Sequence, residues 1–205
     1  MARKVVRHPE EGRKLELVSL TLIALAVLCL ALMTTFYIVD LMFAVLAVMS
    51  SLFLFGGLIL GYMIHKPNVK DMFNVNYNTF IWGALGVALV AIVQMPLLFL
   101  RMSIYNLSVL DSLGVRLFLV SQAVAEECLF AYFLYSFLKK VSFPVLANFS
   151  CAVIFMLMHA AAFSNQIPVL IVVSISRIIL NVIYDLGDLG SSTLAHVVVN
   201  LAAGG

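Results

Sequence analysis

The stretch AVAEECLFAYFLYSFLKK, residues 123–140, decides how this chain has to be interpreted. It is apolar enough for a membrane helix, yet Glu126 and Glu127 lie side by side within it. An ionisable group at the centre of a bilayer costs at least about 2.5–3.5 kcal/mol, and such groups usually face the interior of a helix bundle. The pair therefore predicts a polar site enclosed within a membrane protein.

Composition places the whole chain in the same class. Of its 205 residues, 64% are hydrophobic and 11% are charged, and the mean hydropathy is +1.13. A soluble domain is about half apolar and a quarter charged, so the composition excludes an ordinary soluble protein. The formal net charge of +2 is too small to suggest a nucleic-acid partner. The partner expected for most of the surface is the lipid bilayer.

Seven apolar runs predict an all-α, polytopic transmembrane helix bundle, because about 20 helical residues cross the hydrocarbon core. The runs fall at about 17–39, 41–64, 80–100, 115–138, 143–163, 167–184 and, shorter than the others, 190–203. The first run is too long for the apolar region of a signal peptide, so we expect it to be retained. Pro96 is expected to kink the third run.

Basic residues predict the orientation in the membrane. They are concentrated in the N-terminal segment, residues 1–16, in the loop after the second run and directly after the fourth run, which would all lie on one side. Cytoplasmic loops carry an excess of Lys and Arg, so we expect a multi-pass protein of the cell membrane with a cytoplasmic N-terminus. With seven spans the C-terminus would then lie outside.

The polar groups inside the runs are concentrated in the C-terminal half, and all the ionisable ones fall in the last four runs. This divides an apolar wrapper of three spans, residues 17–114, from a core, residues 115–205, that carries the polar site. The confinement of the ionisable residues to the last four runs predicts one shared internal site. Its candidate residues are Gln122, Glu126, Glu127, His159, Arg177, Asn181, His196 and Asn200.

Helical spacing brings several of these side chains onto common faces, because residues four apart are neighbours on a helix surface. Glu126 and Glu127 are instead about 100° apart around the axis. They are therefore expected to point to different places and to have different roles. The sets with a spacing of four are Phe155/His159, His196/Asn200 and Arg177/Asn181/Asp185.

Such a set of side chains permits hydrolysis. A carboxyl group in an apolar pocket can exchange a proton near neutral pH, and beside a histidine it can orient and deprotonate a water. A second histidine and an asparagine from another helix can donate to the oxyanion of a tetrahedral intermediate. Two histidines and two glutamates can also bind zinc, but the sequence has no HExxH pattern. We therefore expect neither a metal nor a cofactor.

Each of these residues taken singly can also have a purely structural role. A buried histidine can be a packing residue, His196 and Asn200 can hold helices together, and Arg177 can simply neutralise a glutamate. A proton relay in a transporter or channel is a further alternative. A transporter is expected to show two similar halves, and none are evident. Small core positions without disulfides are expected for Cys29, Cys128 and Cys151.

Three motifs in the C-terminal half resemble those of a known family. In order along the chain they are Glu126-Glu127-Cys-Leu-Phe-Ala131, Phe155-Met-Leu-Met-His159 and His196-Val-Val-Val-Asn200. Their order and types resemble the CPBP intramembrane proteases, also called Abi, which include the CAAX prenyl endopeptidases of the Rce1 type. The resemblance covers about residues 115–203, including the approach Asp-Leu-Gly-Ser-Ser-Thr-Leu-Ala-His to the last motif.

The resemblance implies an all-helical fold with a glutamate-type, metal-independent endopeptidase site in a cavity open to membrane and cytosol. It implies that Glu126 activates the water with His159 as its partner, and that Glu127 is a supporting carboxylate. It assigns the oxyanion to His196 and Asn200. The implied substrate is a membrane-associated peptide or protein segment, prenylated substrates included.

One position departs from the family pattern. The arginine of the EExxxR motif is replaced by Ala131, followed by Tyr132 where glycine is common. Two interpretations follow. Arg177 in the sixth run supplies the charge by bonding Glu127 or Glu126, directly or through one water. Alternatively, the chain is a non-catalytic relative that serves as a partner or scaffold subunit of a membrane protein complex.

Overall fold

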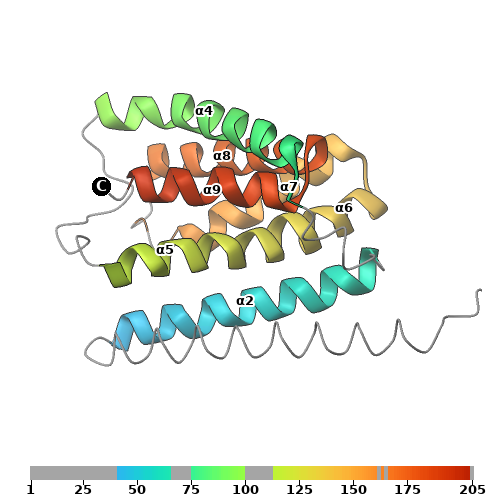
Figure 1. Ribbon diagram of the computed structural model, residues 1–205, viewed down its shortest axis with the longest axis horizontal. Helices are drawn as coiled ribbons and strands as arrows, with labels where there is room; N and C mark the ends of the chain where they lie inside the picture. Colours follow the sequence, from blue (N-terminus) through green and yellow to red (C-terminus); the bar gives the residue numbers. More distant parts are fainter. Residues whose placement is uncertain (1–40, 66–74, 100–112, 161–162, 164–165, 204–205) are drawn as a thin grey trace, which may run out of the picture.

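The computed structural model describes residues 41–65, 75–99, 113–160, 163 and 166–203 (Figure 1). Within these residues every regular element is helical, which confirms the predicted all-α class. The N-terminal segment and the first predicted run, 17–39, lie outside the described residues. The helices are α2 (Leu41–His65), α4 (Tyr77–Phe99), α5 (Leu113–Glu126), the π-helix η1 (Glu127–Tyr135), α6 (Ser136–Val141), α7 (Pro144–His159), α8 (Ile167–Leu186) and α9 (Leu189–Ala203).

Three helical segments are long and apolar enough to cross a membrane by length and composition. They are residues 77–97, 118–141 and 167–186, and shorter apolar helices occupy 50–62, 144–159 and 189–202. The chain is thus built as a membrane protein, whereas a total of seven spans stays a prediction.

The helices begin where the sequence supplies suitable residues. Proline occupies the first turn of both α7 and α8, where its missing N–H costs no intrahelical hydrogen bond. Asp188 precedes α9, and its Oδ1 accepts a hydrogen bond from the backbone N–H of Ser191 at 2.6 Å. The hydroxyl of Thr79 donates to the other oxygen of Asp188 at 2.7 Å. This bond ties the start of α9 to the start of α4.

The helices α5, η1 and α6 form one continuous helical run from Leu113 to Val141. Its middle is a π-helix that begins at Glu127, the second residue of the glutamate pair. Such segments, with hydrogen bonds from i to i+5, are rare and are frequently found at functional sites. The sequence analysis did not predict this segment.

The last helix, α9, lies in the interior of the bundle. It packs against α4, α5, α8 and η1, while α2 covers α5 and η1 from the other side (Figure 1). Glycines allow close approach at two of these contacts. A Cβ added to Gly57 of α2 would meet the backbone of η1, and one added to Gly86 of α4 would lie 2.8 Å from the Cβ of Ala195. Small residues at helix contacts are typical of membrane bundles.

An aromatic and aliphatic cluster joins η1, α7 and α8 beside the polar core. The ring of Phe130 packs edge-on against Phe155, with ring centroids 4.8 Å apart. Cys128 and Cys151 are buried and free, as predicted, whereas Cys29 lies outside the described residues. The helix α4 continues through Pro96 to Phe99.

Candidate functional site

A buried ion pair joins α8 to the first residue of η1. Arg177 donates from Nη1 to Glu127 Oε1 at 2.6 Å and from Nη2 to Oε2 at 3.0 Å. Both side chains are 0% exposed. This two-point contact confirms the prediction that Arg177 bonds a glutamate of the pair. Arg177 thus supplies Glu127 with a cation from another helix, and Ala131, at the position where the motif has arginine, is fully buried.

A third donor of the guanidinium, its Nε–H, is also satisfied within the protein. Arg177 Nε donates to Asn181 Oδ1 at 3.0 Å, one helical turn along α8. The amide of Asn181 donates in turn to Asn148 Oδ1 on α7 at 2.8 Å. Asn148 then donates to the carbonyl of Ile178 at 3.2 Å. The sequence analysis missed Asn148, although a single amide within the fifth apolar run was a usable indication.

The other glutamate faces two histidines. Glu126 Oε1 lies 3.5 Å from His159 Nε2, and Oε2 lies 3.5 Å from His196 Nε2. Gln122, one turn earlier on α5, donates to Oε1 at 2.8 Å. Glu126 is 4% exposed. The structure therefore brings Glu126 and His159 into one site with His196, as the sequence predicted.

His196 contacts both glutamates, which corrects the expectation that the two carboxylates point to different places. Its Nδ1 lies 2.8 Å from Glu127 Oε1, while its Nε2 faces Glu126. One ring can join the two because the wider π-helix begins at Glu127, and because the two nitrogens lie on different edges of the imidazole. The two glutamates still differ in their other partners, as the prediction of different roles requires: Arg177 bonds Glu127, and His159 faces Glu126.

The hydrogen-bond partners assign the histidine tautomers. His159 Nδ1 lies 2.8 Å from the carbonyl of Phe155, which only accepts, so Nδ1 carries the proton. His196 Nδ1 likewise donates to Glu127, a carboxylate already bonded to arginine. With neutral rings, both Nε2 atoms would be acceptors facing the acceptor oxygens of Glu126. The cluster therefore favours holding at least one additional proton among Glu126 and the two Nε2 atoms.

Phe155 supports this arrangement with its ring as well as its carbonyl. The ring centroid lies 4.3 Å from that of His159, and the guanidinium carbon of Arg177 lies 5.5 Å from the ring centroid. A cation over an aromatic face is attracted by the ring quadrupole. The FxxxH spacing thus places one aromatic residue between the catalytic histidine candidate and the buried cation.

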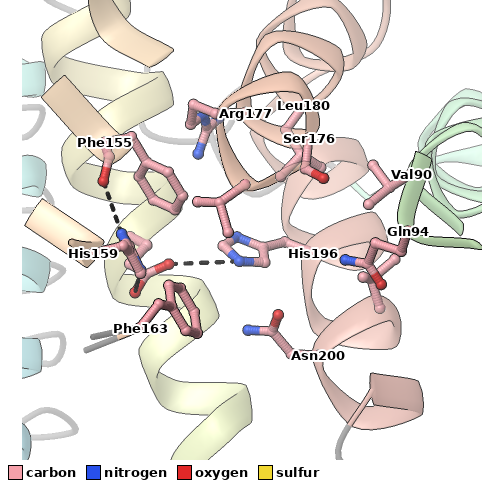
Figure 2. Close-up of a pocket in the computed structure, with 13 residues that line it drawn as sticks. Val90, Gln94, Phe155, His159, Phe163, Ser176, Arg177, Leu180, His196 and Asn200 are labelled. Atoms are coloured by element: carbon pink, nitrogen blue, oxygen red, sulfur yellow. Dashed lines mark hydrogen bonds and ion pairs between the residues drawn. The ribbon is translucent and has the colours of Figure 1, made fainter. Parts of the chain in front are cut away.

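The cluster opens into a pocket with a cavity volume of about 50 Å³, enough for a few water molecules at about 10–15 Å³ each. Figure 2 shows His196 between Phe155 and His159 on one side and Gln94 on the other. Asn200 also lines this pocket, and no described residue forms a hydrogen bond with its side chain. The pocket lining also includes two polar residues that the sequence analysis did not select, Gln94 of α4 and Ser176 of α8.

No group of three or more His, Cys, Asp and Glu residues is arranged to hold a metal ion within the described part of the chain. The side chains that converge here also include asparagine, which is a poor zinc ligand. The expectation of a metal-free site stays a prediction for elemental analysis.

Comparison with known proteins gives one match. Residues 108–202 match the family model described as type II CAAX prenyl endopeptidase Rce1-like. Neither the curated proteins nor the solved structures compared with the chain gave a match. The match includes all three motifs identified in the sequence.

Proposed function

Because residues 108–202 belong to the Rce1-like family, we propose that this protein is an intramembrane endopeptidase. Its substrate would be a membrane-associated peptide or protein segment, including prenylated segments, hydrolysed by a water that Glu126 activates. The observation that carries the proposal is the placement of the Glu126 carboxylate 3.5 Å from two histidine nitrogens at the edge of a pocket. No cofactor enters the proposed reaction.

The first step is attack of water on the scissile carbonyl. Glu126 accepts one proton of the water, and the oxygen bonds to the carbonyl carbon. His159, whose ring is fixed by the Phe155 carbonyl, orients the water and the carboxyl group. The negative charge that develops on the carbonyl oxygen needs donors at the pocket wall.

Asn200 and His196 are placed to supply those donors. The Asn200 amide faces the pocket, and His196 Nε2 becomes a donor when the ring holds the additional proton. A positive His196 is stabilised by Glu127, which bonds its Nδ1 at 2.8 Å. In the second step the C–N bond breaks and the proton held by Glu126 passes to the leaving nitrogen. The products are a carboxylic acid and an amine.

Glu127 acts on this chemistry through its neighbours. Its two oxygens are occupied by Arg177, and one also accepts from His196. It therefore fixes the position and tautomer of His196 without approaching the substrate. Phe155 and Asn181 support the same arrangement by holding His159 and Arg177.

We further propose a multi-pass arrangement of seven spans in the cell membrane, with the N-terminus in the cytoplasm. The described apolar helices and the distribution of Lys and Arg support this arrangement. Cysteine accessibility on the two sides of sealed vesicles tests it. Labelling of a cysteine placed at the N-terminus from the outside would contradict the orientation.

The test of the activity compares wild type with Glu126→Gln and Glu126→Ala on a panel of farnesylated and unmodified membrane peptides. Wild type should cleave at least one peptide, and both variants should lose this activity while keeping an unchanged unfolding transition. Equal cleavage by wild type and both variants would contradict the assigned role of Glu126.

A second function is favoured by Ala131, which stands where the family motif has arginine. On this alternative the chain is a non-catalytic subunit that binds another membrane protein. The same experiment separates the two proposals. No cleavage of any peptide by wild type, together with copurification of a partner in equal amount, would favour the subunit.

A further inference from the structure

The pocket has two chemically different sides. One side carries the ionisable groups Glu126, His159 and His196. The other is formed by α4 and α8 and holds the neutral polar residues Gln94 and Ser176 within an apolar wall (Figure 2). This wall consists of Val90, Val173 and Leu180.

Ser176 carries a buried hydroxyl that has no hydrogen-bond partner in the described part of the chain. The residue is 8% exposed, and among the described residues its Oγ is the buried side-chain polar atom that has no hydrogen-bond partner. A serine within a helix usually bonds a carbonyl of the preceding turn, and an unsatisfied buried hydroxyl lowers stability. An alanine would avoid this cost, so folding stability does not account for the hydroxyl.

Gln94 contributes a second polar group from a different part of the chain. It lies on α4, outside the residues matched by the family model, and it is half-buried at the pocket. No described residue forms a hydrogen bond with its side chain. Its amide can donate and accept at once, as can the Ser176 hydroxyl, so together they match a group that has both a donor and an acceptor.

The charges around the pocket indicate which chemical group of a substrate would bind to Gln94 and Ser176. Arg177 donates from its two terminal nitrogens to Glu127 and from Nε to Asn181, and Glu126 brings a further carboxylate to the pocket. A substrate carboxylate would therefore meet the like charge of Glu126, and the arginine that could balance it is already bonded by Glu127. A neutral peptide group satisfies both polar residues and avoids this repulsion.

We propose that Gln94 and Ser176 form a subsite that binds the peptide group next to the scissile bond, so that the site distinguishes this neutral group from a carboxylate at the same position. This inference rests on the proposed function. Gln94 would act at the half-buried edge of the pocket and Ser176 at its buried wall. Both are binding residues, distinct from the groups that carry out the hydrolysis.

Ser176→Ala tests the buried member, with Ser174→Ala on the same helix as the matched control. Removal of an unsatisfied hydroxyl should raise the unfolding temperature of the free protein by at least about 2 °C. The same change should weaken binding of a farnesylated CAAX-type peptide by about tenfold, through loss of one hydrogen bond. Replacement of a serine with a purely structural role would not raise stability and weaken peptide binding together. Ser174 does not line the pocket, and its replacement should change neither quantity by as much.

Gln94→Met tests the other residue of the subsite, by combining this change in the protein with a change in the peptide. Two uncleavable peptides are compared, both N-methylated at the scissile amide, one of them with the neighbouring peptide group replaced by an ester. The ester removes one N–H donor, so it should weaken binding to wild type by about tenfold and to Gln94→Met by less than about twofold. Equal losses for both proteins would overturn the role of Gln94.

The outcomes for this subsite and for the endopeptidase are distinct. If wild type binds the peptides with these couplings but cleaves none, the subsite stands and the proposed hydrolysis fails. If wild type cleaves peptide but neither variant alters binding, the subsite fails and the hydrolysis stands. If wild type binds none of the peptides, or binds one with a carboxylate in place of the neighbouring peptide group equally well, the subsite is refuted.

Discussion

Replacing Arg177 with alanine should destabilise the bundle by roughly 3–5 kcal/mol, the usual result of removing one partner of a buried ion pair. The structure accounts for this magnitude. Arg177 and Glu127 are both 0% exposed, and the arginine makes two bonds to Glu127 and one to Asn181. Alanine leaves the carboxylate with His196 as its remaining partner and Asn181 without its donor.

The assay is thermal unfolding in detergent micelles, combined with a double-mutant cycle. Each kcal/mol corresponds to about 2–4 °C for a chain of this size, so Arg177→Ala should lower the midpoint by roughly 6–20 °C. Arg177→Met and Glu127→Gln should each destabilise the protein, and the double variant should recover much of the loss because no unpaired charge stays buried. Arg116→Ala, at an exposed arginine, is the control and should change little.

Two results would refute this reasoning. One is a loss below about 1 kcal/mol for Arg177→Ala, which would mean that water or another group solvates Glu127. The other is strict additivity of Arg177→Met and Glu127→Gln, because residues that bond each other must show a coupling energy.

The contacts in and around the site lead to three more expected results. Asn200→Ala should lower kcat by about 10²–10³ with little change in stability. His196→Ala should lower kcat and stability together, because His196 contacts both glutamates. Greater destabilisation by Asn200→Ala than by His196→Ala in thermal unfolding would contradict this. Gly57→Ala should destabilise by about 1–3 kcal/mol, because its Cβ would meet the backbone of η1, while Gly56→Ala has nothing within 4 Å and serves as the control; equal unfolding midpoints would show that α2 can shift away. Elemental analysis of the purified protein should find no stoichiometric zinc, and chelators should leave cleavage unchanged; zinc that is lost on substitution of a site histidine would show that the site holds a metal.

Much of the helical framework was predictable from local properties of the chain. Apolar runs of about 20 residues fix where membrane helices form, since a spanning segment has to satisfy its backbone hydrogen bonds within itself. The six described helical segments therefore lie where the runs predicted them, as with α4 at Tyr77–Phe99 for the run 80–100. Polar residues inside such runs predict a shared interior, and Glu126, His159 and His196 meet there.

The sequence by itself thus determined the class of protein, the helices and the types of residue that converge, because periodicity and hydrophobicity act over a few turns. Only the tertiary structure decided which of them touch. The contact between Arg177 and Glu127 joins residues 50 positions apart, and it depends on the rotation and depth of α8 against η1, which packing sets. The π-helix at Glu127, the bridging position of His196, and the approach of Gln94 and Ser176 to one pocket have the same origin. They depend on several helices packing together, and no local pattern encodes that.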